Sequence, residues 1–152
     1  MLLEAKRPAD IPAEMVVGSR YFVSLVVCDA SSIPPEDIAA CARALLKAGC
    51  VYFCCWGPNC ERVHDIIDEQ YLIVCGYSVN DDDSVIMTTW HNDESLEEAA
   101  WFAINVAFPD DRFFEECKAV VAVCVDNTTW SEGLKHAFAD PRALVGRVVA
   151  ED

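Results

Sequence analysis

The side chains best suited to chemistry gather in residues 54 to 65, CCWGPNCERVHD. Cys60 and His64 are four residues apart and Asp68 is four further on, so on a helix the three share one face. Cysteine and histidine one turn apart can both bind zinc, and His91 from a later loop could join them. One hypothesis is therefore a metal site formed by Cys60, His64 and His91. The alternative is a surface pair between His64 and Asp68.

A reactive thiol is a second hypothesis for the same stretch. Cys60 follows a Gly-Pro-Asn turn and begins a predicted helix, and helix N-termini stabilise thiolates. His91 could serve as acid or base, with Asp29 or Asp126 orienting it, which makes Cys60, His91 and Asp29 the candidate catalytic residues. Glu61 opposes ionisation of the thiol, because nearby negative charge disfavours a thiolate. An inert thiol packed under the turn remains the alternative.

Strands and helices alternate along the chain and must position these residues. β-branched and apolar runs predict strands at 20–28, 50–56, 85–90 and 118–125. Apolar stripes at helical spacing predict helices over 34–48, 59–70, 95–107 and 129–138. The stretch 71–78 fits either an extra strand or a helix tail, and 80–83 is expected to be a polar loop. Gly49 is expected to end the first helix, and Ser95 with Glu98, like Thr129 with Glu132, forms a predicted capping box.

This alternation indicates βαβ units. The predicted fold is a three-layer, Rossmann-like or flavodoxin-like α/β sandwich with a mostly parallel sheet of four or five strands. The chain has no linker, low-complexity tract or repeat, so residues 1–152 are expected to form a single domain with an ordered core from about 18 to 140.

Ligands of open parallel sheets bind outside the carboxyl ends of the strands. The four loops at that rim are rich in tryptophan and in polar side chains, which interfaces and small-molecule pockets both use. The residues expected to line a ligand or partner rim are Trp56, Asn59, Trp90, Asn92, Asp93, Asp126, Asn127 and Trp130.

Composition narrows the class of partner and the compartment. The formal charge is −15, from 26 acidic and 11 basic residues, which disfavours binding to nucleic acid and suits either a basic protein partner or solubility. Apolar runs are too short to cross a membrane, and the N-terminal residues lack the apolar stretch of a signal peptide. The nine cysteines are odd in number and several lie in apolar runs. We therefore expect reduced, buried thiols in a cytoplasmic protein.

Several familiar signatures are missing. The first strand is followed by Asp29-Ala30-Ser31-Ser32 instead of a glycine-rich dinucleotide fingerprint, and neither a phosphate-binding loop nor a nucleophile elbow occurs. Whether the protein uses a cofactor stays open. The leading hypothesis is a non-catalytic binding module whose rim docks a small ligand or a protein partner, such as a basic toxin or defence protein. The Cys60 enzyme or sulfur carrier and the metal site remain alternatives, and self-association stays open.

Two stretches, WGPNCERVHDIIDE at 56–69 and MTTWHNDESLEEAAWFA at 87–103, resemble those of an uncharacterised family of small bacterial proteins, a domain of unknown function. The resemblance extends from Tyr21 to Phe138. It implies a bacterial, cytoplasmic α/β protein and brings no activity that could be assigned to a residue. It draws attention to Trp56, Cys60, His64, Trp90 and His91.

Overall fold

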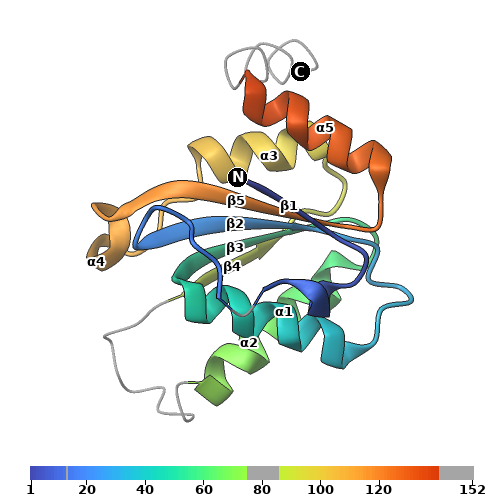
Figure 1. Cartoon of the computed structure of the whole chain (residues 1–152), viewed down its shortest axis with the longest axis horizontal. Helices are drawn as coiled ribbons and strands as arrows, with labels where there is room; N and C mark the ends of the chain where they lie inside the picture. Colours follow the sequence, from blue (N-terminus) through green and yellow to red (C-terminus); the bar gives the residue numbers. More distant parts are fainter. Residues whose placement is uncertain (13, 75–85, 141–152) are drawn as a thin grey trace.

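The computed structural model of the chain describes residues 1–12, 14–74 and 86–140 (Figure 1). Its strands are β1 (Leu2–Ala5), β2 (Tyr21–Val27), β3 (Cys50–Trp56), β4 (Met87–Trp90) and β5 (Cys117–Val125). Its helices are η1 (Pro8–Asp10), α1 (Pro35–Ala48), α2 (Cys60–Val74), α3 (Leu96–Asn105), α4 (Asp111–Phe114) and α5 (Thr128–Ala139).

The five strands form one parallel sheet in the order β1-β5-β2-β3-β4. Helices α1 and α2 cover one face and α3 and α5 cover the other, which gives three layers (Figure 1). The chain moves outward from β2 to β4, with α1 and α2 on the first face. It then returns across the second face to place β5 on the far side of β2. The prediction of a three-layer α/β sandwich, consistent with a Rossmann-like or flavodoxin-like arrangement, is confirmed.

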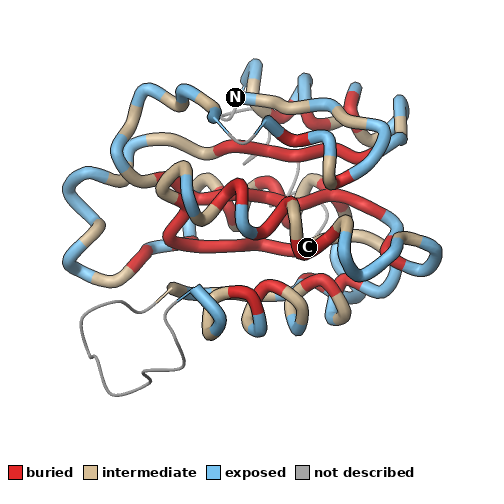
Figure 2. Tube along the Cα trace, turned by 60° about the horizontal axis from the view of Figure 1, so that its bottom comes forward, coloured by how far each residue is buried: buried red, intermediate tan, exposed pale blue. Residues whose placement is uncertain are grey.

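Alternate side chains of the central strands point to opposite faces of the sheet and build two apolar cores. On β3, Phe53 and Cys55 belong to the core under α1 and α2, whereas Tyr52 and Cys54 belong to the core under α3 and α5. The central strands and the inner faces of the helices are buried along most of their length (Figure 2). Since both faces of the sheet are covered, these strands are apolar along nearly their whole length rather than alternating.

The predicted helix signals hold at two positions. Gly49 ends α1 with φ 114°, where its N–H donates to the carbonyls of Leu45 and Leu46. At the start of α3 the Ser95 side chain accepts from the Glu98 N–H, and the Glu98 carboxylate accepts from the Ser95 N–H at 3.0 Å. This reciprocal pair is the capping box that the sequence indicates.

The structure differs from the sequence-based expectation elsewhere. The cap of α5 is Asn127, whose side chain accepts from the N–H of Trp130, so the predicted capping box at Thr129 does not begin that helix. Helix α2 continues to Val74, which makes 71–74 a helix tail. Residues 75–78 and the predicted loop 80–83 lie outside the described residues. Neither α4 nor β1 was expected, and β1 lies well before the anticipated core boundary near 18.

Eight of the nine cysteines are described and all eight are free thiols, seven of them buried. Burial raises the pKa of Cys28, Cys41, Cys50 and Cys54 to about 12. These thiols therefore act as small apolar groups of the core. Within the described segments, no helix has the length and apolar character that spanning a membrane requires.

A candidate binding site at the strand-end rim

A hollow of about 440 Å³ opens between the loops that follow β3 and β4. It exists because these neighbouring strands send the chain to opposite faces: β3 leads into α2 and β4 leads into α3. Trp130, near the start of α5, completes the wall. The hollow is lined by Trp56, Gly57, Pro58, Asn59, His91, Asn92, Asp93, Glu94 and Trp130.

The loop after β3 is held close to the loop after β2. Gly57 has φ 121°, and a Cβ at this position would collide with the carbonyl oxygen of Cys28. The Cys28 N–H donates to the carbonyl of Trp56 at 3.2 Å, and the Ala30 N–H donates to the carbonyl of Pro58 at 3.0 Å. Only glycine allows so close an approach, so the residue fixes where the floor of the hollow lies.

Among the described residues, three with side chains adopt a left-handed backbone, and all three lie at the strand-end rim. Asn59 follows β3 with φ 59°, Asp93 follows β4 with φ 59°, and Asp126 follows β5 with φ 46°. Asparagine and aspartate tolerate this conformation better than other residues with a Cβ. The rim loops are therefore sharply turned, and their side chains have defined directions.

Two tryptophans form the aromatic wall of the hollow. The rings of Trp56 and Trp130 are perpendicular, at an interplanar angle of 86°, with centroids 5.1 Å apart. The indole N–H of Trp56 donates to the backbone carbonyl of Glu94 at 2.9 Å, which ties the β3 strand end to the β4 loop. Trp90, on β4, is instead 42 % exposed. Its ring contacts the imidazole of His64 edge-on, with the ring centroids 4.5 Å apart.

The imidazole of His91 is buried and both of its nitrogens are engaged. Nδ1 lies 2.7 Å from a carboxylate oxygen of Glu94 and Nε2 lies 2.9 Å from the hydroxyl of Thr89. The ring packs edge-on against Phe102 of α3. Because Glu94 can only accept, Nδ1 carries the proton, and Nε2 accepts from Thr89 in the neutral ring. The sequence singled out His91 but neither of these partners, although Thr89 lies two residues away on the same face of β4.

Cys60 begins α2 as expected, but its thiol has a different environment from a catalytic one. The side chain is buried and its Sγ donates to the amide oxygen of Asn92 at 3.2 Å. Burial raises the pKa of Cys60, and backbone N–H groups of His91, Cys60 and Glu61 offset only part of this effect. Cys60 and His91 thus have separate partners, and the favoured form of Cys60 is the neutral thiol.

His64 lies on α2 between two carboxylates, with its own side chain only 16 % exposed. Its Nδ1 is 3.1 Å from Asp65 and its Nε2 is 3.4 Å from Asp68, which is the surface pairing given as the alternative to metal binding. Among the residues that the structure describes, no three His, Cys, Asp or Glu side chains are grouped in a way that could hold a metal ion. The metal hypothesis gains no support from this geometry.

The remaining predicted rim residues lie at the same edge of the sheet but outside the first hollow. The Asp29 carboxylate accepts from the Ser31 N–H within its own loop, which lowers the pKa of Asp29. Asn127 caps α5, while Asp126 is exposed and lines a second hollow.

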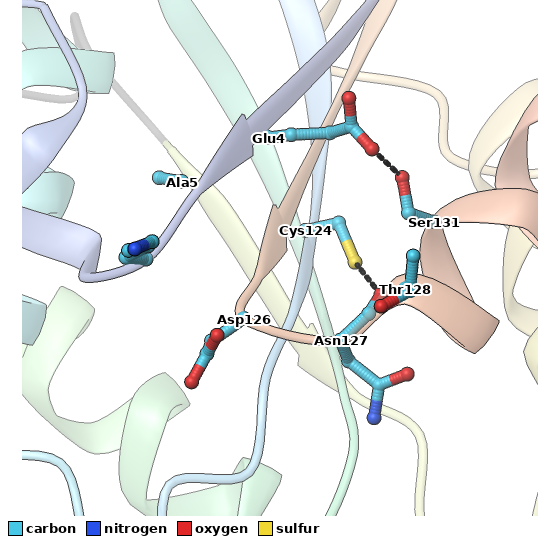
Figure 3. A pocket seen from close by; sticks show the side chains of 8 residues that line it. Glu4, Ala5, Cys124, Asp126, Asn127, Thr128 and Ser131 are labelled. Atoms are coloured by element: carbon cyan, nitrogen blue, oxygen red, sulfur yellow. Dashed lines mark hydrogen bonds between the residues drawn. The ribbon is translucent and has the colours of Figure 1, made fainter.

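This second hollow, of about 250 Å³, lies between the ends of β1 and β5 and the start of α5 (Figure 3). Glu4 on β1 accepts a hydrogen bond from the buried hydroxyl of Ser131, and the thiol of Cys124 donates to the carbonyl of Asn127 (Figure 3). Lys6 also lines it. The sequence missed Glu4, Lys6 and Ser131 as rim residues because β1 was not recognised as a strand.

The fold and rim define an α/β protein of the open parallel-sheet class. A family model, domain of unknown function (DUF7684), matches residues 2–141, and the chain belongs to this family. No curated protein and no solved structure matches the chain.

Proposed function

We propose that this protein is a binding module that docks a basic segment of a protein partner at the hollow between the β3 and β4 loops. The observation that carries the proposal is the lining of the hollow. It combines two indole rings with the carboxylates of Asp93 and Glu94, and no lysine or arginine is among its lining residues in the described part of the chain. Aromatic rings and uncompensated carboxylates together suit a cationic, partly apolar ligand.

The formal charge of −15 supports the same choice of partner. A strongly acidic protein attracts basic partners over distances of about 10 Å at ordinary ionic strength and repels polyanions. A basic toxin or defence protein is one partner of this kind. The separate hydrogen bonds of Cys60 and His91 favour binding over thiol chemistry at this rim. We also propose a bacterial cytoplasmic location, which the free thiols and the family resemblance support.

The test is retention of proteins from bacterial cytosol on immobilised wild-type protein, Asp93→Asn and Asp126→Asn. Both aspartates are exposed rim residues with positive φ, and asparagine tolerates that backbone. The two variants therefore remove the same charge, but only Asp93 lines the hollow. We expect basic proteins to be retained by wild type and Asp126→Asn, and severalfold less by Asp93→Asn, with release at high salt. Equal retention by all three forms would contradict the proposal.

A further inference from the structure

We propose that the hollow between the β3 and β4 loops receives the guanidinium group of an arginine, in preference to a lysine ammonium group. This inference rests on the proposed function and names the side chain that the site selects. It draws on three features of the hollow: the state of its carboxylates, the arrangement of its indole rings and the fixed position of its loops.

The carboxylates provide charge that the chain itself leaves uncompensated. Asp93 is exposed, and no hydrogen bond or ion pair with another described residue engages its carboxylate. Glu94 gives one oxygen to His91 and keeps its side chain 40 % exposed. Adjacent acids on one turn offer several acceptor oxygens to a donor with more than one N–H. Arginine carries five such donors in a planar fork, whereas lysine is a compact point charge.

The indole rings favour a flat cation. A perpendicular pair leaves both faces of one ring, and one face of the other, clear of the partner ring. Guanidinium stacks on such faces and is less strongly hydrated than ammonium, so it loses less hydration on entering. The volume of about 440 Å³ leaves space for the side chain and for part of the partner backbone.

The loops hold these groups in place before a ligand arrives. The Trp56 indole N–H is bonded to the carbonyl of Glu94, and the His91 backbone N–H donates to the carbonyl of Cys55 at 2.9 Å. Asp93 occupies a sharp left-handed turn between these two anchor points. Binding therefore requires little reordering of the site, which preserves affinity for a single side chain.

The four tryptophans make a direct experiment available, since each gives one indole N–H signal in a nitrogen–proton correlation spectrum. The probes are the Nα-acetyl methylamides of arginine, lysine and citrulline, the last being a neutral isostere of arginine. We expect arginine to shift the signals of Trp56 and Trp130 and to leave Trp101 unchanged. We expect citrulline to shift none, and lysine to bind more weakly than arginine. In Asp93→Asn the arginine affinity should fall about twofold to fivefold, and in Asp126→Asn it should be unchanged.

Each contrary result has a distinct meaning. Equal binding of arginine and lysine would overturn the guanidinium preference, and binding of citrulline would overturn the role of charge. No shift of Trp56 and Trp130 with any probe, or shifts confined to Trp90, would overturn the arginine site. If retention of basic proteins still depended on Asp93 in that case, the proposed function would stand without it. If neither the tryptophan shifts nor the dependence of retention on Asp93 were observed, the proposed function would be contradicted as well.

Discussion

Nδ1 of His91 lies 2.7 Å from Oε2 of Glu94. The imidazole itself is buried. The carboxylate fixes the tautomer, and the opposite nitrogen consequently accepts from Thr89. A carboxylate, an imidazole and a hydroxyl linked in this order by hydrogen bonds resemble the catalytic triad of hydrolases. Thr89 is not among the residues that line the hollow in the described part of the chain, and the network ties β4 to the loop that follows it.

The first prediction concerns Thr89. Replacing it with valine should lower the free energy of unfolding by about 1–3 kcal/mol, because a buried imidazole nitrogen loses its hydrogen-bond partner. Thr89→Ser keeps the hydroxyl and should lose less. Urea denaturation of both variants checks this. If Thr89→Val proved as stable as Thr89→Ser, the hydrogen bond between Thr89 and His91 would not contribute to the free energy of unfolding.

The second prediction concerns the close approach at Gly57. Gly57→Ala should destabilise the protein by about 2–4 kcal/mol, because the new Cβ meets the Cys28 carbonyl and the positive φ disfavours alanine. Gly133→Ala is the matched control. Its Cβ would lie 3.5 Å from a Leu96 methyl group inside α5, an ordinary contact, so it should be neutral or stabilise by up to about 1 kcal/mol. Similar loss in both variants would contradict the packing of the Gly57 loop.

The third prediction separates binding from thiol chemistry. Iodoacetamide at neutral pH should modify Cys117 before Cys60, because burial raises the pKa of both thiols but Cys117 is partly exposed whereas Cys60 is buried. Peptide mass spectrometry over a time course gives the two rates in the same sample. Preferential labelling of Cys60 would instead support the alternative of a Cys60-dependent enzyme.

The fourth prediction concerns alkaline pH. The folded pKa of Cys28, Cys41, Cys50 and Cys54 is about 12, above the ordinary thiol value of 9.0. The folded state therefore retains protons that the unfolded state has released. The thiols contribute their full stability below pH 9 and lose it as the pH rises towards 12.

The free energy of unfolding should consequently fall between pH 9 and 11, by up to about 1.4 kcal/mol per pH unit for each buried thiol. Cys41→Ala should reduce this slope by the contribution of one proton, about 1.4 kcal/mol per pH unit, whatever the effect of the substitution on stability at neutral pH. Denaturation at several pH values measures the slope directly. An unchanged slope would show that Cys41 does not titrate with unfolding.

The sequence predicts the fold well where hydrophobic runs are long. Strands β2, β3 and β5 are covered on both faces, so their apolar runs are unmistakable. Strand β1 has only four residues, LLEA, which suit a helix equally well, and it becomes a strand because β5 offers an edge for pairing. Short segments of this kind depend on tertiary contacts that periodicity does not contain.

The rim was predictable for a simpler reason: all parallel strands end at the same edge, so their loops could be identified without the strand order. Which loops face one another depends on that order. The structure brings Trp56, Asp93 and Trp130 together, while Asp126 lines a different hollow. The capping role of Asn127 was also missed, because Thr129 and Glu132 offered a competing capping box in the sequence.

The position of β1 beside β5 has a consequence for how the protein is made. Leu2 pairs with Ala122, so β1 has no partner strand until β5, much later in the sequence, has been synthesised. Strands β2, β3 and β4 can assemble with α1 and α2 in order of synthesis, but β1 must wait for β5. The second hollow, which needs Glu4 and Ser131 together, is therefore expected to be completed only at the final stage of folding.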